Sequence, residues 1–415
     1  MERGSILRRL TVVVGATLAV TVGNSLPAQA LTALASPEAP NNAEAAAGWL
    51  ARQLVDGERM EIVFDGTAYP DQGLTADVVL ALDSAKVGQE HAAKATAWLS
   101  TPDVLSGYLG DGTAESYAGA HAKLALVAQA QGRNPASFGG VDLLSRLTAL
   151  QAPSGRFSDK SSFGDNSNGI TQALAVVTLE RAGTAPAVAV DYLIGSACPD
   201  GGFPLYFEQP ACASDVDTTG LVTQALLAAG RTAEAGKALD WLQGKQQGDG
   251  GFGGSGPTPG VNANSTGLAA AALHVGGRTA PAERAVGYLT SLQVGCAGAA
   301  ADRGGIAYDR AGFSADNARR ATAQAIPGIT GVGLSEATAE SALGPAPALD
   351  CGGAPAPSTP DTSPVDGNQP VDPVDKGRPE LAATGADLGT AVTLGGVLLL
   401  AGIGLLVLRR RGTSS

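Results

Sequence analysis

The sequence predicts an all-α protein built from repeated helix pairs, and two observations lead to this prediction. Between about residues 45 and 343, short Ala- and Leu-rich runs alternate with Gly-rich loops, and no alternating strand pattern stands out. Two helices in each repeat are typical of an α-solenoid, in which every repeat packs against its neighbours. The second runs recur at a nearly constant period, with separations of 46, 50, 51 and 47 residues between their opening glycines Gly73, Gly119, Gly169, Gly220 and Gly267.

The period divides residues 45–343 into six predicted helix pairs. The first helix of each pair contains a large apolar or aromatic residue, and the second helix is richer in alanine and opens on small polar residues. The six first helices are predicted within residues 46–54, 95–102, 141–151, 189–197, 238–247 and 285–293. The six second helices are predicted within residues 72–82, 118–128, 168–177, 219–230, 266–277 and 316–325.

The loops between these helices contain a repeated motif. They read QAPSGRF at 151–157, DGGF at 200–203 and QQGDGGF at 246–252. The pattern Gln-x-x-x-Gly-x-aromatic resembles the repeat of the squalene cyclase and protein prenyltransferase superfamily. That resemblance implies a closed (α/α)6 toroid whose second helices form an inner ring around a cavity. The glycines permit positive φ, and we expect Phe157, Phe203 and Phe252 to pack back onto the helix pairs.

The N-terminus is typical of a secretory signal peptide, predicted over residues 1–30. Three arginines precede an apolar stretch that runs from about Leu10 to Val22. Ala28-Gln29-Ala30 follows, with small residues where a signal peptidase cuts. A second small-residue site at 33–35 leaves two expected cleavage points, after Ala30 or after Ala35.

The C-terminus has three signals in order. A Pro-, Asp- and Ser-rich stretch at 344–380 is predicted to be a disordered stalk, and an apolar run at 388–408 is long enough to form one transmembrane helix. The basic tail at 409–415 favours a cytoplasmic end. The pentapeptide between stalk and span is Leu381-Ala382-Ala383-Thr384-Gly385.

This order resembles a sortase cell-wall sorting signal of the LAxTG type. The resemblance implies that sortase cleaves after Thr384 and joins Thr384 covalently to peptidoglycan. The protein is then expected to be secreted and anchored in a Gram-positive cell wall, its precursor held in the plasma membrane by the C-terminal helix. A plain C-terminal membrane anchor is the alternative.

Charge and cysteine content narrow the partners. The formal net charge is −12, from 39 acidic and 27 basic residues, which argues against a nucleic-acid partner. Four cysteines, an even number, suit an oxidising compartment. We expect the disulfides Cys198–Cys212 and Cys296–Cys351.

Residues 215–220, DVDTTG, open the fourth predicted inner helix. They resemble the Asp-x-Asp-Asp-Thr acid motif of class II terpene cyclases: Asp215 matches the first Asp, Asp217 the second, which protonates substrate in that family, and Thr218 replaces the third. A helix N-terminus favours an ionised carboxylate, and Asp217 also fits an N-cap region. The chain contains only 3 Trp, 7 Tyr and 8 Phe, so few aromatics are expected to line a cavity. Asp217 is therefore expected to be a helix-start residue.

Small polar residues gather at the other inner-helix starts. Each is expected to cap its own helix or to offer hydrogen bonds to a ligand in the cavity. No spacing of His, Cys or Asp predicts a metal site, and no motif predicts a cofactor. The candidate ligand-binding residues are Asp71, Asp77, Tyr117, His121, Asn166, Asn168, Thr171, Asp215, Asp217, Asn262, Asn264, Asp316 and Asn317.

Together these patterns predict a wall-anchored, non-enzymatic module that displays the toroid for binding an unidentified small molecule or surface partner. The alternative is a terpene-cyclase-like isomerase with Asp217 as general acid. The two hypotheses differ in the expected cavity. An enzyme requires a deep, closed, apolar pocket with Asp217 buried in it, whereas a display module requires an open polar mouth.

Overall fold

The computed structural model describes residues 42–255 and 259–351. The predicted signal peptide, the LAATG motif, the apolar span and the basic tail lie outside these residues. Within them, no helix is both long and apolar enough to cross a membrane.

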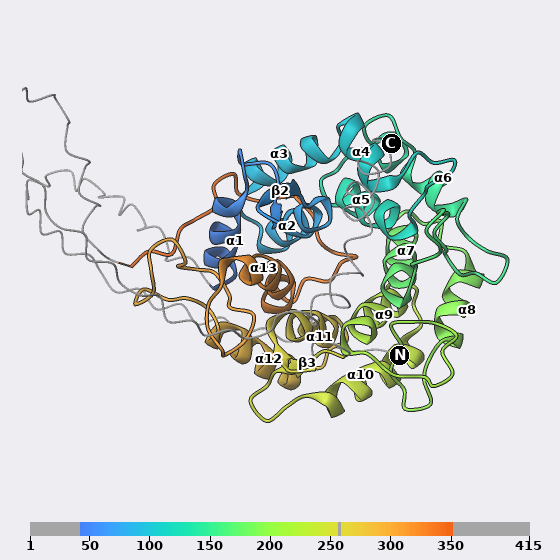
Figure 1. Cartoon of the computed structure of the whole chain (residues 1–415). Helices are drawn as coiled ribbons and strands as arrows, with labels where there is room; N and C mark the ends of the chain where they lie inside the picture. Colours follow the sequence, from blue (N-terminus) through green and yellow to red (C-terminus); the bar gives the residue numbers. More distant parts are fainter. Residues whose placement is uncertain (1–41, 256–258, 352–415) are drawn as a thin grey trace, which may run out of the picture. The chain divides into compact units, whose positions relative to one another are not determined.

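Six helices form an inner ring, in agreement with the predicted second helix of each pair (Figure 1). Each contacts the next along the chain, and the last contacts the first, so the ring closes. The toroid architecture is thereby confirmed. The inner helices are α2 (Gln72–Ala85), α5 (Ala118–Ala130), α7 (Gly169–Arg181), α9 (Val216–Ala228), α11 (Ala263–Val275) and α13 (Ala315–Thr330).

The remaining helices surround this ring and pack against its outer face. Six contain the predicted first-helix runs, and α4, which follows α3 directly, was not predicted as a separate helix. A short 3-10 turn, η1 (Pro135–Ser137), precedes α6. The outer helices are α1 (Asn42–Gln53), α3 (Gln89–Leu99), α4 (Pro102–Leu109), α6 (Leu143–Thr148), α8 (Ala187–Gly195), α10 (Thr232–Lys245) and α12 (Thr279–Ser291).

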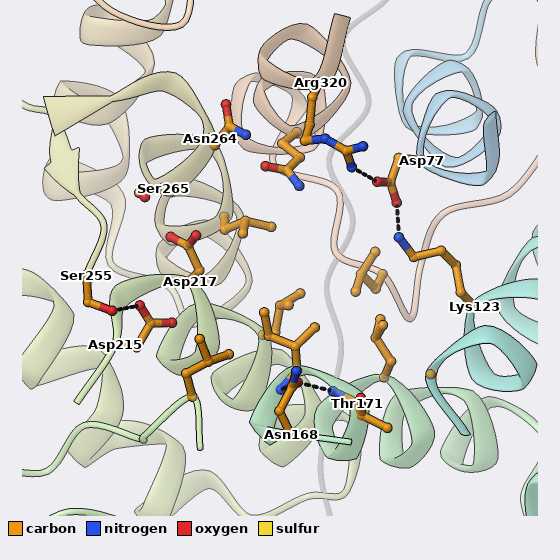
Figure 2. Close-up of a pocket in the computed structure, with 18 of the residues that line it drawn as sticks. Asp77, Lys123, Asn168, Thr171, Asp215, Asp217, Ser255, Asn264, Ser265 and Arg320 are labelled. Carbon is orange, nitrogen blue, oxygen red and sulfur yellow. Dashed lines mark hydrogen bonds and ion pairs between the residues drawn. The ribbon is translucent and has the colours of Figure 1, made fainter. Parts of the chain in front are cut away.

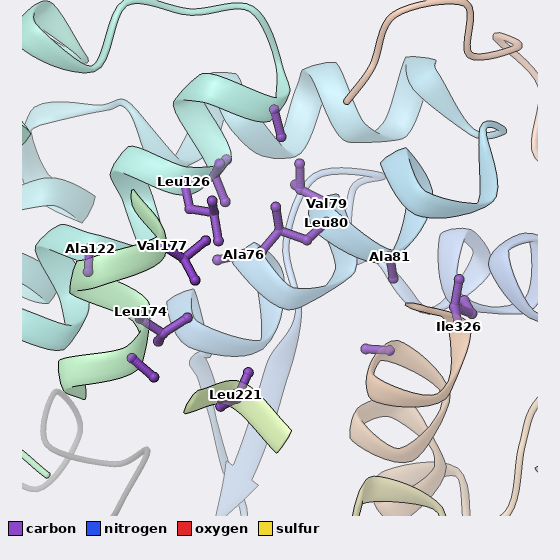
Figure 3. Packing of buried hydrophobic residues seen from close by; sticks show 14 of the residues in the cluster. Ala76, Val79, Leu80, Ala81, Ala122, Leu126, Leu174, Val177, Leu221 and Ile326 are labelled. Carbon is purple, nitrogen blue, oxygen red and sulfur yellow. The ribbon is translucent and has the colours of Figure 1, made fainter. Parts of the chain in front are cut away.

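Small residues let the inner helices approach one another. Figure 3 shows alanines and branched aliphatic side chains of α2, α5 and α7 packed together, among them Ala76, Ala122 and Val177. A Cβ atom added at Gly267 of α11 would lie 2.2 Å from the carbonyl oxygen of Gln324 on α13. Any side chain at that position would therefore push these two helices apart.

The glycine-containing loops dock in the same way in successive repeats. Phe157, Phe203 and Phe252 are fully buried or nearly so, as expected. The backbone N–H of Phe203 donates to Thr219 Oγ1 at 2.9 Å, and that of Phe252 donates to Thr266 Oγ1 at 2.9 Å. Each loop is thereby fixed to the first turns of the inner helix that follows it.

Two short hairpins differ from the prediction, which contained helices and loops alone. Strands β1 (Glu61–Phe64) and β2 (Thr67–Pro70) pair before α2. Asp65 and Gly66 both have positive φ, 50° and 71°, as a two-residue type I′ turn requires. The Asp-Gly pair between β-prone residues was therefore a missed hairpin signal. A second, shorter hairpin pairs β3 (Phe252–Gly253) with β4 (Val261–Asn262).

The C-terminal segment 332–348 runs across the C-terminal ends of inner helices. Arg181 Nη1 at the end of α7 donates to the carbonyl of Leu334 at 2.8 Å, and Leu343 N donates to the carbonyl of Lys86 beyond α2 at 2.8 Å. The first residues of the predicted stalk, from position 344 onward, continue this packing. The segment therefore covers one end of the ring.

Both expected disulfides are confirmed. Cys198–Cys212 ties the ends of the loop between α8 and α9. Cys296–Cys351 joins the loop after α12 to the end of the described chain. No free cysteine occurs among residues 42–255 and 259–351.

Candidate active site

The inner ring encloses a cavity of about 870 Å³. Residues of all six inner helices, and of the loops at their N-terminal ends, form its wall. Leu334 of the C-terminal segment contributes at the other end. The lining is predominantly apolar, with side chains that include Leu80, Ile170, Leu174, Leu221, Leu268 and Ala271.

Asp215 is the N-cap of α9. Its Oδ1 accepts hydrogen bonds from the backbone N–H of Thr218 at 2.7 Å and from Thr218 Oγ1 at 2.6 Å. Its Oδ2 accepts a third, from Ser255 Oγ at 2.6 Å (Figure 2). The carboxylate of Asp215 is therefore held by three donors, and the threonine in place of a third aspartate supplies two of them.

Asp217 lies in the first turn of α9, two residues after the cap, and points into the cavity (Figure 2). Its Oδ1 is buried and has no hydrogen-bond partner. Burial, and then the negative charge of Asp215, raise the pKa of Asp217, a hydrogen bond from Ser265 partly opposes them, and the pKa lies at about 7 as a result. Asp217 is half-buried, and it forms part of the cavity wall.

Asp217 is a residue of the helix start, as expected, but Asp215 is the N-cap of α9, so the interpretation of Asp217 as part of the cap is wrong. The pKa of Asp217 is also raised, whereas the helix dipole alone would lower it. The dipole acts through free N–H groups at the helix start, and here the Asp215 side chain occupies one of them. Desolvation disfavours the charged form of a buried carboxyl group. The raised pKa favours the protonated form of Asp217 more than in an ordinary aspartate, which is the direction a general acid requires.

A second polar group lies on another wall of the cavity. Lys123 Nζ of α5 donates to Asp77 Oδ1 of α2 at 2.7 Å. Arg320 of α13 donates from Nη2 to Asp71 Oδ2 at 3.0 Å, and its Nη1 lies 3.6 Å from Asp77 Oδ2. We call these four residues the ionic tetrad. Figure 2 shows Asp77, Lys123 and Arg320 across the cavity from Asp217.

Four tyrosines line the cavity, so the expectation of few aromatic residues there is also wrong. Tyr117 precedes α5 and was a candidate, whereas Tyr108 of α4, Tyr206 and Tyr308 were not. Tyr206 and Tyr308 stand in loops before inner helices. Burial raises the pKa of Tyr108, which keeps its hydroxyl protonated. These tyrosines belong to loops and to the outer helix α4. The expectation rested only on the aromatic residues of the predicted helices and glycine-rich loops.

Asp159 is a further cavity carboxyl group that the sequence did not reveal. It lies in the loop between α6 and α7, and its Oδ1 accepts a hydrogen bond from the backbone N–H of Ala118 at the start of α5, at 2.8 Å. Burial raises the pKa of Asp159 to about 6. No local pattern identifies Asp159, because its hydrogen-bond partner is 41 residues away in the chain.

Lys123 could have been identified from the sequence, because it is a lysine within an apolar helical run.

The structure brings most of the predicted residues together. Asp71 caps α2 and joins the ionic tetrad without lining the cavity. His121 is buried away from the cavity, with Nδ1 2.7 Å from the carbonyl of Tyr117. Asp316 and Asn317 are exposed and lie outside the lining. The predicted residues that line the cavity are Asp77, Tyr117, Asn166, Asn168, Thr171, Asp215, Asp217, Asn262 and Asn264.

Comparisons with known proteins support the fold. At the level of sequence, neither a family model nor a curated protein matches the chain. Among solved structures, a protein from Actinoplanes is 18% identical, with 70% of this chain and 99% of that chain covered and a TM-score of 0.51. The type II terpene cyclase MstE from Scytonema is 17% identical, with 70% and 96% covered and a TM-score of 0.52. An α-amylase from Clostridium perfringens is 11% identical, with 72% and 99% covered and a TM-score of 0.53.

At these identities the likeness shows the fold, which is that of the terpene cyclases and similar toroids. It nevertheless contradicts the prediction of a non-enzymatic display module. Two of the three structures named above are enzymes, and variants of MstE were solved with geranylgeranyl dihydroxybenzoate as substrate and merosterolic acid A as product. The cavity meets part of the criterion set for an enzyme, because it is mainly apolar and contains Asp217, although it is partly open to solvent.

Proposed function

We propose that the domain is a terpene-cyclase-like isomerase that protonates a carbon–carbon double bond of a polyene, with Asp217 as the general acid. The observation that supports this proposal most is the position of Asp217 in a mainly apolar cavity, where its Oδ1 is buried without a hydrogen-bond partner. An alkene is a much weaker base than water. Its protonation therefore requires an acid that is kept away from bulk water. The mainly apolar lining of the cavity limits the contact of Asp217 with water.

The reaction conserves atoms. The carboxyl proton of Asp217 moves to one alkene carbon, and the π electrons of that double bond form the new C–H bond. The neighbouring carbon becomes a carbocation, the next double bond attacks it, and a ring C–C bond forms. Loss of a proton from the last cation regenerates a double bond, and Asp217 is then reprotonated from solvent. The product is an isomer of the substrate.

Asp215 has a positioning role in this scheme. Its carboxylate is fixed by Thr218 and Ser255 and contacts no cation among the described residues. The negative charge raises the affinity of Asp217 for its proton before transfer. The tyrosines that line the cavity supply aromatic rings, and an aromatic face attracts a cationic intermediate through its quadrupole.

Product formation from squalene and from geranylgeraniol tests the proposal. The purified wild-type protein is expected to convert at least one of them to cyclic isomers, detected by gas chromatography with mass spectrometry. Asp217→Asn should lower the rate by roughly 100-fold or more, since general acid catalysis is lost. Asp83→Asn is a matched control, because Asp83 is a buried carboxyl group with a raised pKa on α2, outside the cavity.

The control should keep the wild-type rate within a few-fold. Recovery of every polyene unchanged by wild type, or equal rates in wild type and Asp217→Asn, contradicts the assignment. Soluble starch belongs in the same assay, because one similar toroid is an α-amylase. Release of reducing sugar in place of cyclic product would assign the cavity to glycoside hydrolysis.

We further propose that the domain acts outside the cell, attached to peptidoglycan through Thr384. The LAATG motif, the apolar span and the terminal arginines support this proposal. The two disulfides also suit an oxidising compartment.

A further inference from the structure

We propose that the substrate of this site is an uncharged polyene, such as an isoprenoid alcohol or hydrocarbon, and not a prenyl diphosphate. This inference rests on the proposed cyclase function and deepens it. It follows from the charges of the cavity wall and from the state of the inner-helix N-termini, two features that decide whether a diphosphate has anything to bind.

Among the described residues, the basic side chains that line the cavity are Lys123 and Arg320. Both are already paired within the ionic tetrad, in which two cations face two carboxylates. The side chains are largely buried, with 9% of Lys123 and 15% of Asp77 exposed. The tetrad as a whole is therefore electrically neutral, and recruiting either cation to a ligand would leave a buried carboxylate unpaired.

The rest of the wall adds negative charge. Asp215 faces the cavity with hydroxyl and amide donors as its partners. Asp159 adds a second carboxyl group, with a pKa raised to about 6, which is mostly ionised at neutral pH. A diphosphate carries several negative charges, so entry into this cavity would bring like charges together where solvent screens them poorly.

Helix N-termini are the other common phosphate sites, because their first N–H groups point outward and the dipole favours an anion. Five of the six inner helices have such an N–H occupied by a side chain. Four are bound by their own N-cap residue, and Ala118 N of α5 is bound by Asp159. The four caps are Asp71 on α2, Asn168 on α7, Asp215 on α9 and Asn262 on α11.

At three of these five helix starts the acceptor is a carboxylate, from Asp71, Asp215 or Asp159. A carboxylate oxygen therefore already occupies the position that a phosphate oxygen would take. The wall between the polar groups is apolar and matches an isoprenoid chain. Among the described residues, the cavity thus offers a phosphate no unpaired cation, and at five inner-helix starts the phosphate would compete with a side chain already bound there. An uncharged polyene requires neither kind of group.

Equilibrium dialysis tests the inference without requiring turnover. Tritiated geranylgeraniol and tritiated geranylgeranyl diphosphate are compared on the purified full-length protein in one mild detergent at low ionic strength. The alcohol should bind about tenfold or more tightly than the diphosphate, because the two ligands share their chain and differ in charge. Any diphosphate binding should strengthen as salt is added, since salt screens repulsion.

Asp77→Asn gives a gain-of-binding test. It removes the carboxylate next to Lys123, leaving that cation unpaired in the cavity. Diphosphate affinity should then rise about tenfold or more, with alcohol affinity unchanged within a few-fold. In Asp83→Asn, on the same helix but outside the cavity, both affinities should stay at their wild-type values.

Equal or tighter binding of the diphosphate by wild type overturns the inference, as does diphosphate binding that weakens with salt. An Asp77→Asn variant that folds and gains no diphosphate affinity also overturns it. Alcohol that binds in preference to the diphosphate but yields no cyclic product supports the substrate class and counts against the proposed reaction. The two hypotheses therefore fail separately.

Discussion

At the scale of single residues, Asp215 and Asp217 show how two like side chains acquire different roles. Asp215 has three hydrogen-bond donors and caps a helix, whereas Asp217 Oδ1 has none and is buried. Helix geometry separates them, because residues two apart on a helix point in different directions. One carboxylate is stabilised by its partners, and the other holds its proton.

The pH dependence of the proposed reaction should report the influence of Asp215. Wild-type activity should fall as pH rises through about 7, where Asp217 loses its proton. Asp215→Asn removes a negative charge but keeps a capping oxygen, so the pKa of Asp217 should fall. The alkaline limb of the pH–rate profile should move to lower pH, with a smaller effect at pH 5 than at pH 7. A profile that does not move would show that Asp215 leaves Asp217 unperturbed.

The same pKa predicts the effect of Asp217→Asn on stability. The pKa of Asp217 is raised in the folded protein, so its contribution to stability is fully present below about pH 4 and is lost as pH rises through about 7. Asparagine has no charge to bury. At pH 8 the variant should therefore be more stable than wild type by on the order of 2 to 4 kcal/mol.

Denaturant unfolding at pH 4 and pH 8 measures this difference. The advantage of Asp217→Asn should shrink or disappear at pH 4, where the wild-type group is protonated in both states. A variant that is less stable than wild type at pH 8 would show that Asp217 gains more from its surroundings than burial takes away.

At the scale of elements, the turns between helices hold the repeat together. Gly155 has φ of 93°, and a Cβ atom there would lie 2.1 Å from the carbonyl oxygen of Val188 on α8. Gly250 and Gly304 stand in equivalent loops with φ of 89° and 93° and face backbone carbonyls in the same way. The recurring glycine is thus required both for its conformation and for close packing against the next outer helix.

A pair of glycine substitutions separates these two requirements. Gly155→Ala combines an unfavourable φ with a backbone clash, so it should lower the free energy of unfolding by roughly 3 kcal/mol or more. Gly183→Ala is the matched control, with φ of 67° and open space around the added Cβ. It should lower that free energy by about 1 kcal/mol. Equal losses in urea unfolding would show that the contact with Val188 contributes nothing.

At the scale of the whole molecule, two sets of contacts close the ring, one between the last and first inner helices and one made by the C-terminal segment. Helix α13 contacts α2, and the C-terminal segment 332–348 crosses the end of the ring and reaches α1 through Pro347. The Cys296–Cys351 disulfide fastens the residues just beyond that segment.

Cell fractionation tests the proposed attachment. Replacement of Thr384 by alanine should move the protein from the peptidoglycan fraction to the membrane or the medium, because the sortase-type cleavage needs that residue as the acyl donor. An Ala383→Ser variant, at the variable position of the LAxTG pattern, serves as the control and should remain in the wall fraction. Unchanged wall retention of Thr384→Ala would exclude sortase attachment.

The sequence by itself determined the repeat, the number of helix pairs and some of the helix caps. The period of glycines placed the inner helices, and Asp215, Asn168 and Asn262 cap theirs because capping depends on residues within one turn. Both disulfide pairings were also predicted correctly. These are local properties, or consequences of a fixed period.

Only the tertiary structure decided what the cavity contains. The ionic tetrad joins α2, α5 and α13, whose residues Asp77 and Arg320 stand more than 200 positions apart in the chain. Asp159 reaches α5 from a loop of another repeat. The pKa of Asp217 was misjudged because the helix dipole is visible in sequence, whereas desolvation depends on every chain segment that surrounds the group. Burial is a property of the closed ring, so no stretch of residues taken alone can specify it.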